Sequence, residues 1–391
     1  MSQPHPQPTA TTAAGRVPFL PLLGGLGLLY LPACWQGYGT DNDIYLVLRV
    51  GQAWWQGQGY APSRNQGFPA FEGALGGLSL LGGPVLCNLV TLGMGLLALW
   101  ALGKLAQRMG LRHIVWGLLL VGLHPLYMRA ANSSVDYLWA LACYLLALER
   151  LSAHRHAPLR GAGLATALLA GLLLGTGVGL RNGTAVLALA ALALGPWLGW
   201  ARLLVAVGLG GLVGMAWYWP PFAAAGHSLA FLEVHNVPAW SAMQRLVRFL
   251  YRNVYFWGLA ATAVLGVGKL LFARRFLQVP APWLAWLAAV ALGAEALFAW
   301  LPFEPEYLLP ILPLAGPVVA HAWPHRWTMA LLAAIVSYHF VSLNLIEPDR
   351  PNAATSGRVR PQFGPGITLQ DWHQRQQRDS LWHHKEPQIF E

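Results

Sequence analysis

Apolar runs of about twenty residues recur along most of this chain, between residues 17 and 345. About 20 apolar residues in a helix span the hydrocarbon core of a bilayer. Backbone groups in lipid must be hydrogen-bonded within the spanning segment, so each run is predicted to be a helix. Only 10% of the residues are charged, against about 25% in an ordinary soluble domain. The sequence therefore predicts an all-α polytopic membrane protein.

The apolar runs predict about eleven transmembrane helices. Their expected ranges are 17–34, 76–102, 112–128, 135–150, 161–180, 184–200, 203–219, 250–271, 283–301, 306–322 and 327–345. Within the second range, Gly82, Gly83 and Pro84 predict a break in the helix. With this count, the Arg and Lys residues between the runs fall mostly in alternate loops, and the positive-inside rule makes that side cytoplasmic.

The same alternation predicts the domain plan and the location of the termini. Residues 1–16 are expected to be a disordered cytoplasmic N-terminus, 17–345 the transmembrane domain and 346–391 a hydrophilic tail on the outer side. Two long loops, 35–75 and 220–249, are expected on the outer face. The excess of Arg over Lys favours a GC-rich bacterial genome, so the predicted location is a bacterial cytoplasmic (inner) membrane, with the N-terminus in and the C-terminus out.

Composition excludes several other classes. The net charge of +10 does not indicate nucleic-acid binding, because no basic stripe is interleaved with aromatic residues. Cys34, Cys87 and Cys143 lie in or beside apolar runs without ligand-like spacing, and are interpreted as small apolar residues.

Two carboxylates, Asp41 and Asp43, stand one residue apart just after the first apolar run. Apolar residues at helical spacing follow them, which predicts an amphipathic helix over 43–56 in the first outer loop. A carboxylate at a helix start is stabilised by the free N–H groups and the helix dipole. Capping alone would explain one Asp but not both.

Four stretches in order resemble the GT-C class of integral-membrane glycosyltransferases. They are GYAPSRNQGFPAFE (59–72), NSSVDYLWAL (132–141), GTGVGLRNG (175–183) and EYLLPILP (306–313), and the resemblance covers about residues 17–345. The late stretch departs from that class, which often carries Arg before the Tyr, because Glu304 and Glu306 stand there instead.

The resemblance implies a GT-C-like fold and a polyprenyl-phosphate-linked sugar donor. The acceptor is then a hydroxyl of a glycan, lipid or protein, and the reaction inverts the anomeric centre. Asp43 or Asp41 is the implied general base, because the acceptor hydroxyl must lose its proton as it attacks. The lipid phosphate needs cationic or N–H partners. Candidates are Arg181 and Arg129 at outer helix ends, and Arg64 in the first loop.

Several candidates have plainer alternatives. Asp136 is a candidate for substrate binding and also a candidate helix cap. Glu233 and His235 in the second long loop could bind substrate or, with an Asp, a divalent cation such as Mg or Mn, or be ordinary loop residues. Arg245 begins a basic face that would meet lipid headgroups, donor phosphate or only solvent.

Two rival functions stay open on the sequence alone. A transporter or lipid flippase would carry charged residues at mid-membrane and paired broken helices in repeats; Glu295 is one such acid, but no internal repeat is evident. A non-catalytic membrane scaffold would use the acidic pair only as a cap.

Overall fold

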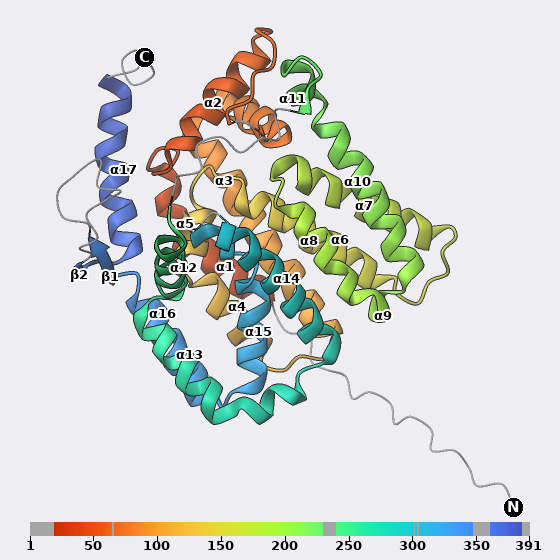
Figure 1. The fold of residues 1–391 in the computed structure, drawn as a ribbon, viewed down its shortest axis with the longest axis vertical. Helices are drawn as coiled ribbons and strands as arrows, with labels where there is room; N and C mark the ends of the chain where they lie inside the picture. Colours follow the sequence, from red (N-terminus) through yellow and green to blue (C-terminus); the bar gives the residue numbers. More distant parts are fainter. Residues whose placement is uncertain are drawn as a thin grey trace, which may run out of the picture.

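The computed structural model describes residues 19–64, 66–229, 240–300, 302, 305–346 and 360–384. These residues are predominantly helical, and the helices pack into one bundle with a separate helix, α17, standing at its edge (Figure 1). The first half contains α1 (Phe19–Tyr30), η1 (Leu31–Trp35), α2 (Asn42–Trp55), α3 (Pro69–Arg108), α4 (Ile114–Gly122), α5 (Pro125–Ala131), α6 (Tyr137–Ala153), α7 (Ala162–Leu180), α8 (Thr184–Ala190), η2 (Ala191–Leu194) and α9 (Gly195–Leu198). The second half contains α10 (Trp200–Trp217), α11 (Trp219–Ala224), α12 (Ala242–Trp257), α13 (Leu259–Phe272), η4 (Ala273–Gln278), α14 (Ala281–Trp300), η5 (Pro305–Leu308), α15 (Leu312–Ala322), α16 (His325–Ser337), β1 (Val341–Ile346), β2 (Arg360–Pro365) and α17 (Ile367–His384).

The helices agree with the predicted apolar runs in place but not always in length. Among the described residues, four helices are long and apolar enough to cross a membrane, or up to six if each bent pair is one span. The predicted run 184–200 is instead three short pieces, α8, η2 and α9. The predicted count of about eleven spans is therefore not confirmed.

Helix α3 breaks where glycine and proline predict it. Gly82 and Gly83 have non-helical backbone angles, and Pro84 follows them. Gly83 has φ 58, a left-handed conformation that residues with a Cβ rarely adopt. This prediction is confirmed.

Two predicted segments are wrong in detail. The run 250–271 is not one straight helix, because α12 and α13 meet at Gly258 with a bend of 90°. The last predicted span, 327–345, ends as a helix at Ser337, and β1 then pairs antiparallel with β2. The described chain is thus not strictly all-α, because Val341–Ile346 pairs with Arg360–Pro365 as two strands.

Segments near the loops that carry most of the Arg and Lys residues contact one another. The backbone N–H of Arg112 donates to His321 (2.9 Å), and His321 is also hydrogen-bonded to the carbonyl of Gln278 (3.2 Å). Arg202 donates to the carbonyl of Ala157. These contacts join segments that the sequence predicts on one side of the membrane; the alternation of the remaining loops stays a prediction.

The opposite end of the bundle gathers the loops predicted to face outward, and we call it the acidic end. Contacts there join the first loop to Ser134, Asn182 and α17. Two ion pairs join the neighbouring segments, Arg181 with Asp136 and Arg129 with Glu306. Helix α2 lies against α3 at a close crossing of Gly51 and Gly76. A Cβ on either glycine would overlap the backbone of the other helix, so the crossing requires glycine at both positions.

Candidate functional site

The first outer loop forms the amphipathic helix that its sequence predicts. Ile44, Val47 and Leu48 are each at most 2% exposed and pack toward α3. Asp41 is the N-cap of α2, and its side chain accepts a hydrogen bond from the backbone N–H of Asp43 (2.9 Å). The capping interpretation is therefore correct for Asp41, which holds the start of the helix in place.

Asp43 does not cap the helix but pairs with the next part of the loop. Its Oδ2 accepts a hydrogen bond from Arg64 Nη1 at 2.9 Å, and both side chains are about one third exposed, at 33% and 29%. Burial raises the pKa of Asp43, while Arg64 opposes the rise and Asp41 and Asp136 add to it. The guanidinium of Arg64 also lies over the ring of Phe68, 4.4 Å from its centroid.

Glu72 holds the segment that carries Arg64, a role that the sequence did not reveal. This carboxylate is fully buried. It accepts hydrogen bonds from the backbone N–H of Ser63 (2.9 Å) and from the hydroxyls of Ser63 and Tyr60. Burial and the nearby Glu72 both raise the pKa of Tyr60, so its hydroxyl stays a donor. A buried carboxylate with three donors fixes a loop.

Arg181 forms a buried ion pair with Asp136. Its Nη1 lies 2.9 Å from both carboxylate oxygens of Asp136, and the side chains are only 12% and 4% exposed. The guanidinium stacks between Tyr137 and Tyr307, at 3.7 and 5.1 Å from the ring centroids. Asp136 occupies the N-cap position of α6 without making a side-chain cap bond, so the capping alternative for Asp136 is wrong.

Arg129 forms the third pair, with Glu306 of η5. The arginine is 30% exposed and the glutamate 8%. Glu306 thus meets a cation of the same site although it stands where the resembling class often carries Arg.

Two cavities adjoin at these pairs. The first, of about 50 Å³, is mainly apolar. Its lining comprises Tyr137, Ala140, Leu141, Arg181, Gly183, Thr184, Val186, Leu187, Ala294, Leu297, Glu306, Tyr307, Leu309 and Pro310. The second, of about 250 Å³, is lined by Thr40, Asp41, Arg129, Ala130, Ser133, Val135, Tyr137, Glu306 and Gln374. We call them the apolar cavity and the polar cavity; Tyr137 and Glu306 belong to both walls.

Four charged residues of the acidic end line the two adjoining cavities, and Glu306 lines both. Arg181 lines the apolar cavity, whereas Asp41 and Arg129 line the polar one. Asp43, Arg64 and Asp136 line neither, but Arg64 interacts electrostatically with both Asp43 and Asp136. Of the described acidic side chains around these cavities, Asp41 is the carboxylate that forms no ion pair.

Of the three candidates in the second long loop, the structure describes only Arg245. Glu233 and His235 lie outside the described residues. Arg245 is on α12, which packs against η5, but it lines neither of the two cavities. Within the described chain, no three His, Cys, Asp or Glu side chains form a metal-binding group. A divalent cation involving Glu233 and His235 stays a prediction.

No family model and no curated protein matches this chain. Solved structures with the same fold include ArnT from Cupriavidus metallidurans in the apo state, at 17% identity and TM-score 0.57, covering 81% of this chain and 62% of that one. ArnT bound to undecaprenyl phosphate matches at 14% identity and TM-score 0.57, covering 83% and 64%. The Archaeoglobus fulgidus oligosaccharyltransferase tethered to an acceptor peptide with the NVT sequon matches at 12% identity and TM-score 0.50, covering 95% and 57%.

These similarities confirm the GT-C-like fold expected from the sequence. The chain spans about three fifths of the length of the proteins that it matches. At these identities the likeness concerns the fold, and the activity has to be argued from the site.

Proposed function

We propose that this protein is a membrane glycosyltransferase that moves a sugar from a polyprenyl-phosphate donor to an acceptor hydroxyl. The observation that carries the proposal is the junction of the two cavities. An apolar cavity with an arginine in its wall adjoins a polar cavity with a carboxylate that forms no ion pair among the described residues. A lipid-linked donor has the same two parts, an apolar chain and a charged, polyhydroxylated head.

The apolar cavity, of about 50 Å³, suits the phosphate-proximal end of the donor's lipid and not the whole chain. Leucine, valine and alanine side chains of α6, α8 and α14 line it, and these helices belong to the apolar bundle. Arg181 supplies the positive charge that a phosphate requires, and Tyr137 and Tyr307 fix the plane of its guanidinium. Charge-assisted hydrogen bonds from an arginine stabilise a phosphate more strongly than neutral ones do.

The proposed reaction is a single displacement at the anomeric carbon. The acceptor oxygen forms a bond to that carbon, and the bond from the carbon to the phosphate oxygen breaks. The proton of the acceptor hydroxyl passes to the general base, and polyprenyl phosphate leaves with the bonding pair. A single displacement inverts the anomeric centre. Arg181 and Arg129 stabilise the charge that develops on the leaving phosphate.

Asp41 is the better candidate for the base than Asp43. Asp41 lines the polar cavity, and one of its oxygens, Oδ1, is held by the N–H of Asp43. This hydrogen bond orients the carboxylate. Asp43 is committed to Arg64, so its role is to position the first loop. A general base must lie within hydrogen-bond reach of the proton that it removes.

The structural neighbours support the substrate kinds. One is bound to undecaprenyl phosphate, and another is an oligosaccharyltransferase tethered to an acceptor peptide. The rival transporter function rests on Glu295 at mid-span. That carboxylate accepts a hydrogen bond from Asn253 of α12 (3.2 Å), and this contact between helices accounts for it without a transport path.

The decisive experiment uses purified protein in detergent or nanodiscs with polyprenyl-phosphate-linked sugars extracted from the producing cells. Release of polyprenyl phosphate is followed by mass spectrometry after addition of the cell-envelope fraction as acceptor. Wild type should release it, and Asp41→Asn should not. If wild type binds the lipid-linked sugar but never releases polyprenyl phosphate with any envelope fraction, the function is not glycosyl transfer.

A further inference from the structure

The C-terminal tail contributes a helix to the acidic end of the bundle. Helix α17 packs against α5, and Figure 1 shows it along one edge of the bundle. The first turn of α17 is attached through His339. The ring of His339 is hydrogen-bonded to Thr368 Oγ1 (2.6 Å) and to the carbonyl of Leu123 (2.8 Å). The beginning of α17 is therefore tied to the break between α4 and α5.

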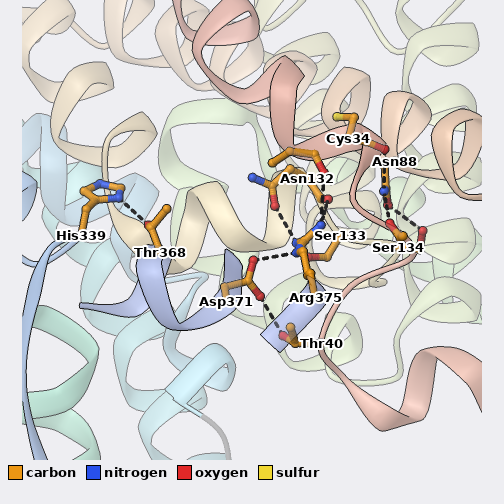
Figure 2. A network of polar contacts seen from close by, with 12 residues as sticks. Cys34, Thr40, Asn88, Asn132, Ser133, Ser134, His339, Thr368, Asp371 and Arg375 are labelled. Atoms are coloured by element: carbon orange, nitrogen blue, oxygen red, sulfur yellow. Dashed lines mark hydrogen bonds and ion pairs between the residues drawn. The ribbon is translucent and has the colours of Figure 1, made fainter. Parts of the chain in front are cut away.

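A buried arginine makes the second attachment. Arg375 is 1% exposed, and Figure 2 shows its guanidinium between Asp371 and the loop before α6. It donates to Asp371 Oδ2 (2.8 Å), to the carbonyls of Asn132 (2.9 Å) and Ala33 (3.3 Å) and to Asn132 Oδ1 (2.9 Å). It also donates to the hydroxyl of Ser133. A buried guanidinium requires such complete pairing, because a lost partner leaves an uncompensated charge.

This network reaches the residue beside the proposed base. Asp371 accepts a hydrogen bond from the hydroxyl of Thr40 (2.7 Å), and Thr40 precedes Asp41 in the chain. Thr40 and Ser133 both line the polar cavity. Arg375 and Asp371 thus fix two parts of the cavity wall with respect to α17.

Gln374, next to Arg375, lines the polar cavity itself. A carboxamide both donates and accepts hydrogen bonds, which is the capacity needed to bind sugar hydroxyls. The side chains around it in the cavity include a hydroxyl, a carboxylate and an arginine, and this mixture suits a polyhydroxylated group.

We infer that α17 is an integral wall of the polar cavity, in which Gln374 binds a hydroxyl of a polyhydroxylated group and Arg375 is the positioning residue that holds the helix there. The inference rests on the proposed function for the identity of that group, which is either the transferred glycosyl group or a glycan acceptor. The position of the helix itself does not depend on the function.

The wall is tested first without any substrate. Val135 lines the polar cavity, whereas the native Cys34, Cys87 and Cys143 are buried. The variant Val135→Cys can therefore be labelled selectively with sulfonatoethyl methanethiosulfonate. The reagent forms a mixed disulfide with the thiol and releases methanesulfinate. Adding Arg375→Met should accelerate labelling at least tenfold, and Arg375→Lys should accelerate it less. An unchanged labelling rate in both double variants, with melting temperatures near that of Val135→Cys, would show that α17 does not form part of the cavity wall. This result does not depend on whether the protein transfers sugar.

Gln374→Ala tests the binding role, with Leu369→Ala on the exposed side of α17 as the matched control. The polyprenyl-phosphate-linked sugar extract and the envelope fraction are titrated separately. Gln374→Ala should raise KM for one of them three- to tenfold while kcat changes less than twofold, and Leu369→Ala should change neither. A rise for the donor assigns the contact to the glycosyl group, and a rise for the envelope fraction assigns it to the acceptor. Unchanged KM for both would refute the role of Gln374 even if transfer itself is demonstrated.

Discussion

The two cavities at the acidic end share Tyr137 and Glu306 but differ in the rest of their lining. Half of the residues that line the apolar cavity are leucine, valine or alanine, and its one arginine, Arg181, has a side chain that is 12% exposed. The polar cavity is larger and contains Asp41, Arg129 and several hydroxyl and amide groups. Apolar lining suits a hydrocarbon chain but cannot accept a proton, whereas the carboxylate of Asp41 in the polar cavity can. The comparison indicates that lipid binding and chemistry are separable by mutation.

The largest expected effect is on chemistry alone. Asp41→Asn should lower the rate of polyprenyl phosphate release by about 10²–10⁴-fold, the usual contribution of a general base. Asn can still cap α2 through its side-chain oxygen, so the fold should survive. Binding of undecaprenyl phosphate, measured by native mass spectrometry, should stay within twofold of wild type. Equal losses of binding and release would show that the two cavities do not act separately.

The next effect concerns the charge in the apolar cavity. Arg181→Ala should weaken binding of undecaprenyl phosphate by about 10- to 100-fold, because a charge-assisted hydrogen bond contributes about 1.5–3 kcal/mol. It should also lower the melting temperature, since Asp136 is left buried without its partner. Arg181→Lys keeps the charge and should recover part of the affinity. If Arg181→Ala binds the lipid as wild type does, the phosphate is held elsewhere.

A smaller effect should follow from filling the apolar cavity. Ala294 is 3% exposed and lines it, so Ala294→Leu should weaken undecaprenyl phosphate binding by about tenfold, equivalent to an overpacking cost of about 1–3 kcal/mol. Ala296→Leu on the exposed side of α14 is the control. The labelling rate of Val135→Cys in the polar cavity should not change. A change in that rate would mean that the cavities are mechanically coupled.

The smallest expected effect is a pH dependence of stability. Burial raises the pKa of Asp43 above its ordinary value of 3.8, so the folded state binds its proton more tightly than the unfolded state. Stability should therefore fall as pH rises through the interval above 3.8, by less than about 1 kcal/mol because the group is partly solvated. Asp43→Asn should flatten this slope in urea unfolding curves at pH 4–6. A wild-type slope of opposite sign would show that Arg64 dominates.

Much of the secondary structure follows from local sequence. The amphipathic spacing after Asp41 predicts α2, and the Gly82–Pro84 stretch predicts the break in α3. The division of the run 184–200 does not follow from the sequence, because α8 and η2 lie in one continuous apolar run. Hydropathy identifies an apolar run but does not predict the backbone angles within it.

The partners within the site did not follow from the sequence. Asp136 could have capped α6, yet it pairs with Arg181, 45 positions away. Arg375 carried no signal in a hydrophilic tail, yet it is buried against Asn132, 243 positions away. Nothing local distinguishes Asp41 from Asp43, and only the arrangement of α2, η5 and α17 puts Asp41 in a cavity wall.

The apolar helices and the concentration of carboxylates in the loops of one end can both be read from the order of the residues. Hydrophobic periodicity and charge placement act over a few turns and can be seen in any stretch of residues. The pairing of each carboxylate with its arginine, and the set of residues that share a cavity, come from the three-dimensional packing of the helices. Those choices depend on contacts between helices far apart in the chain, where burial makes each unpaired charge costly.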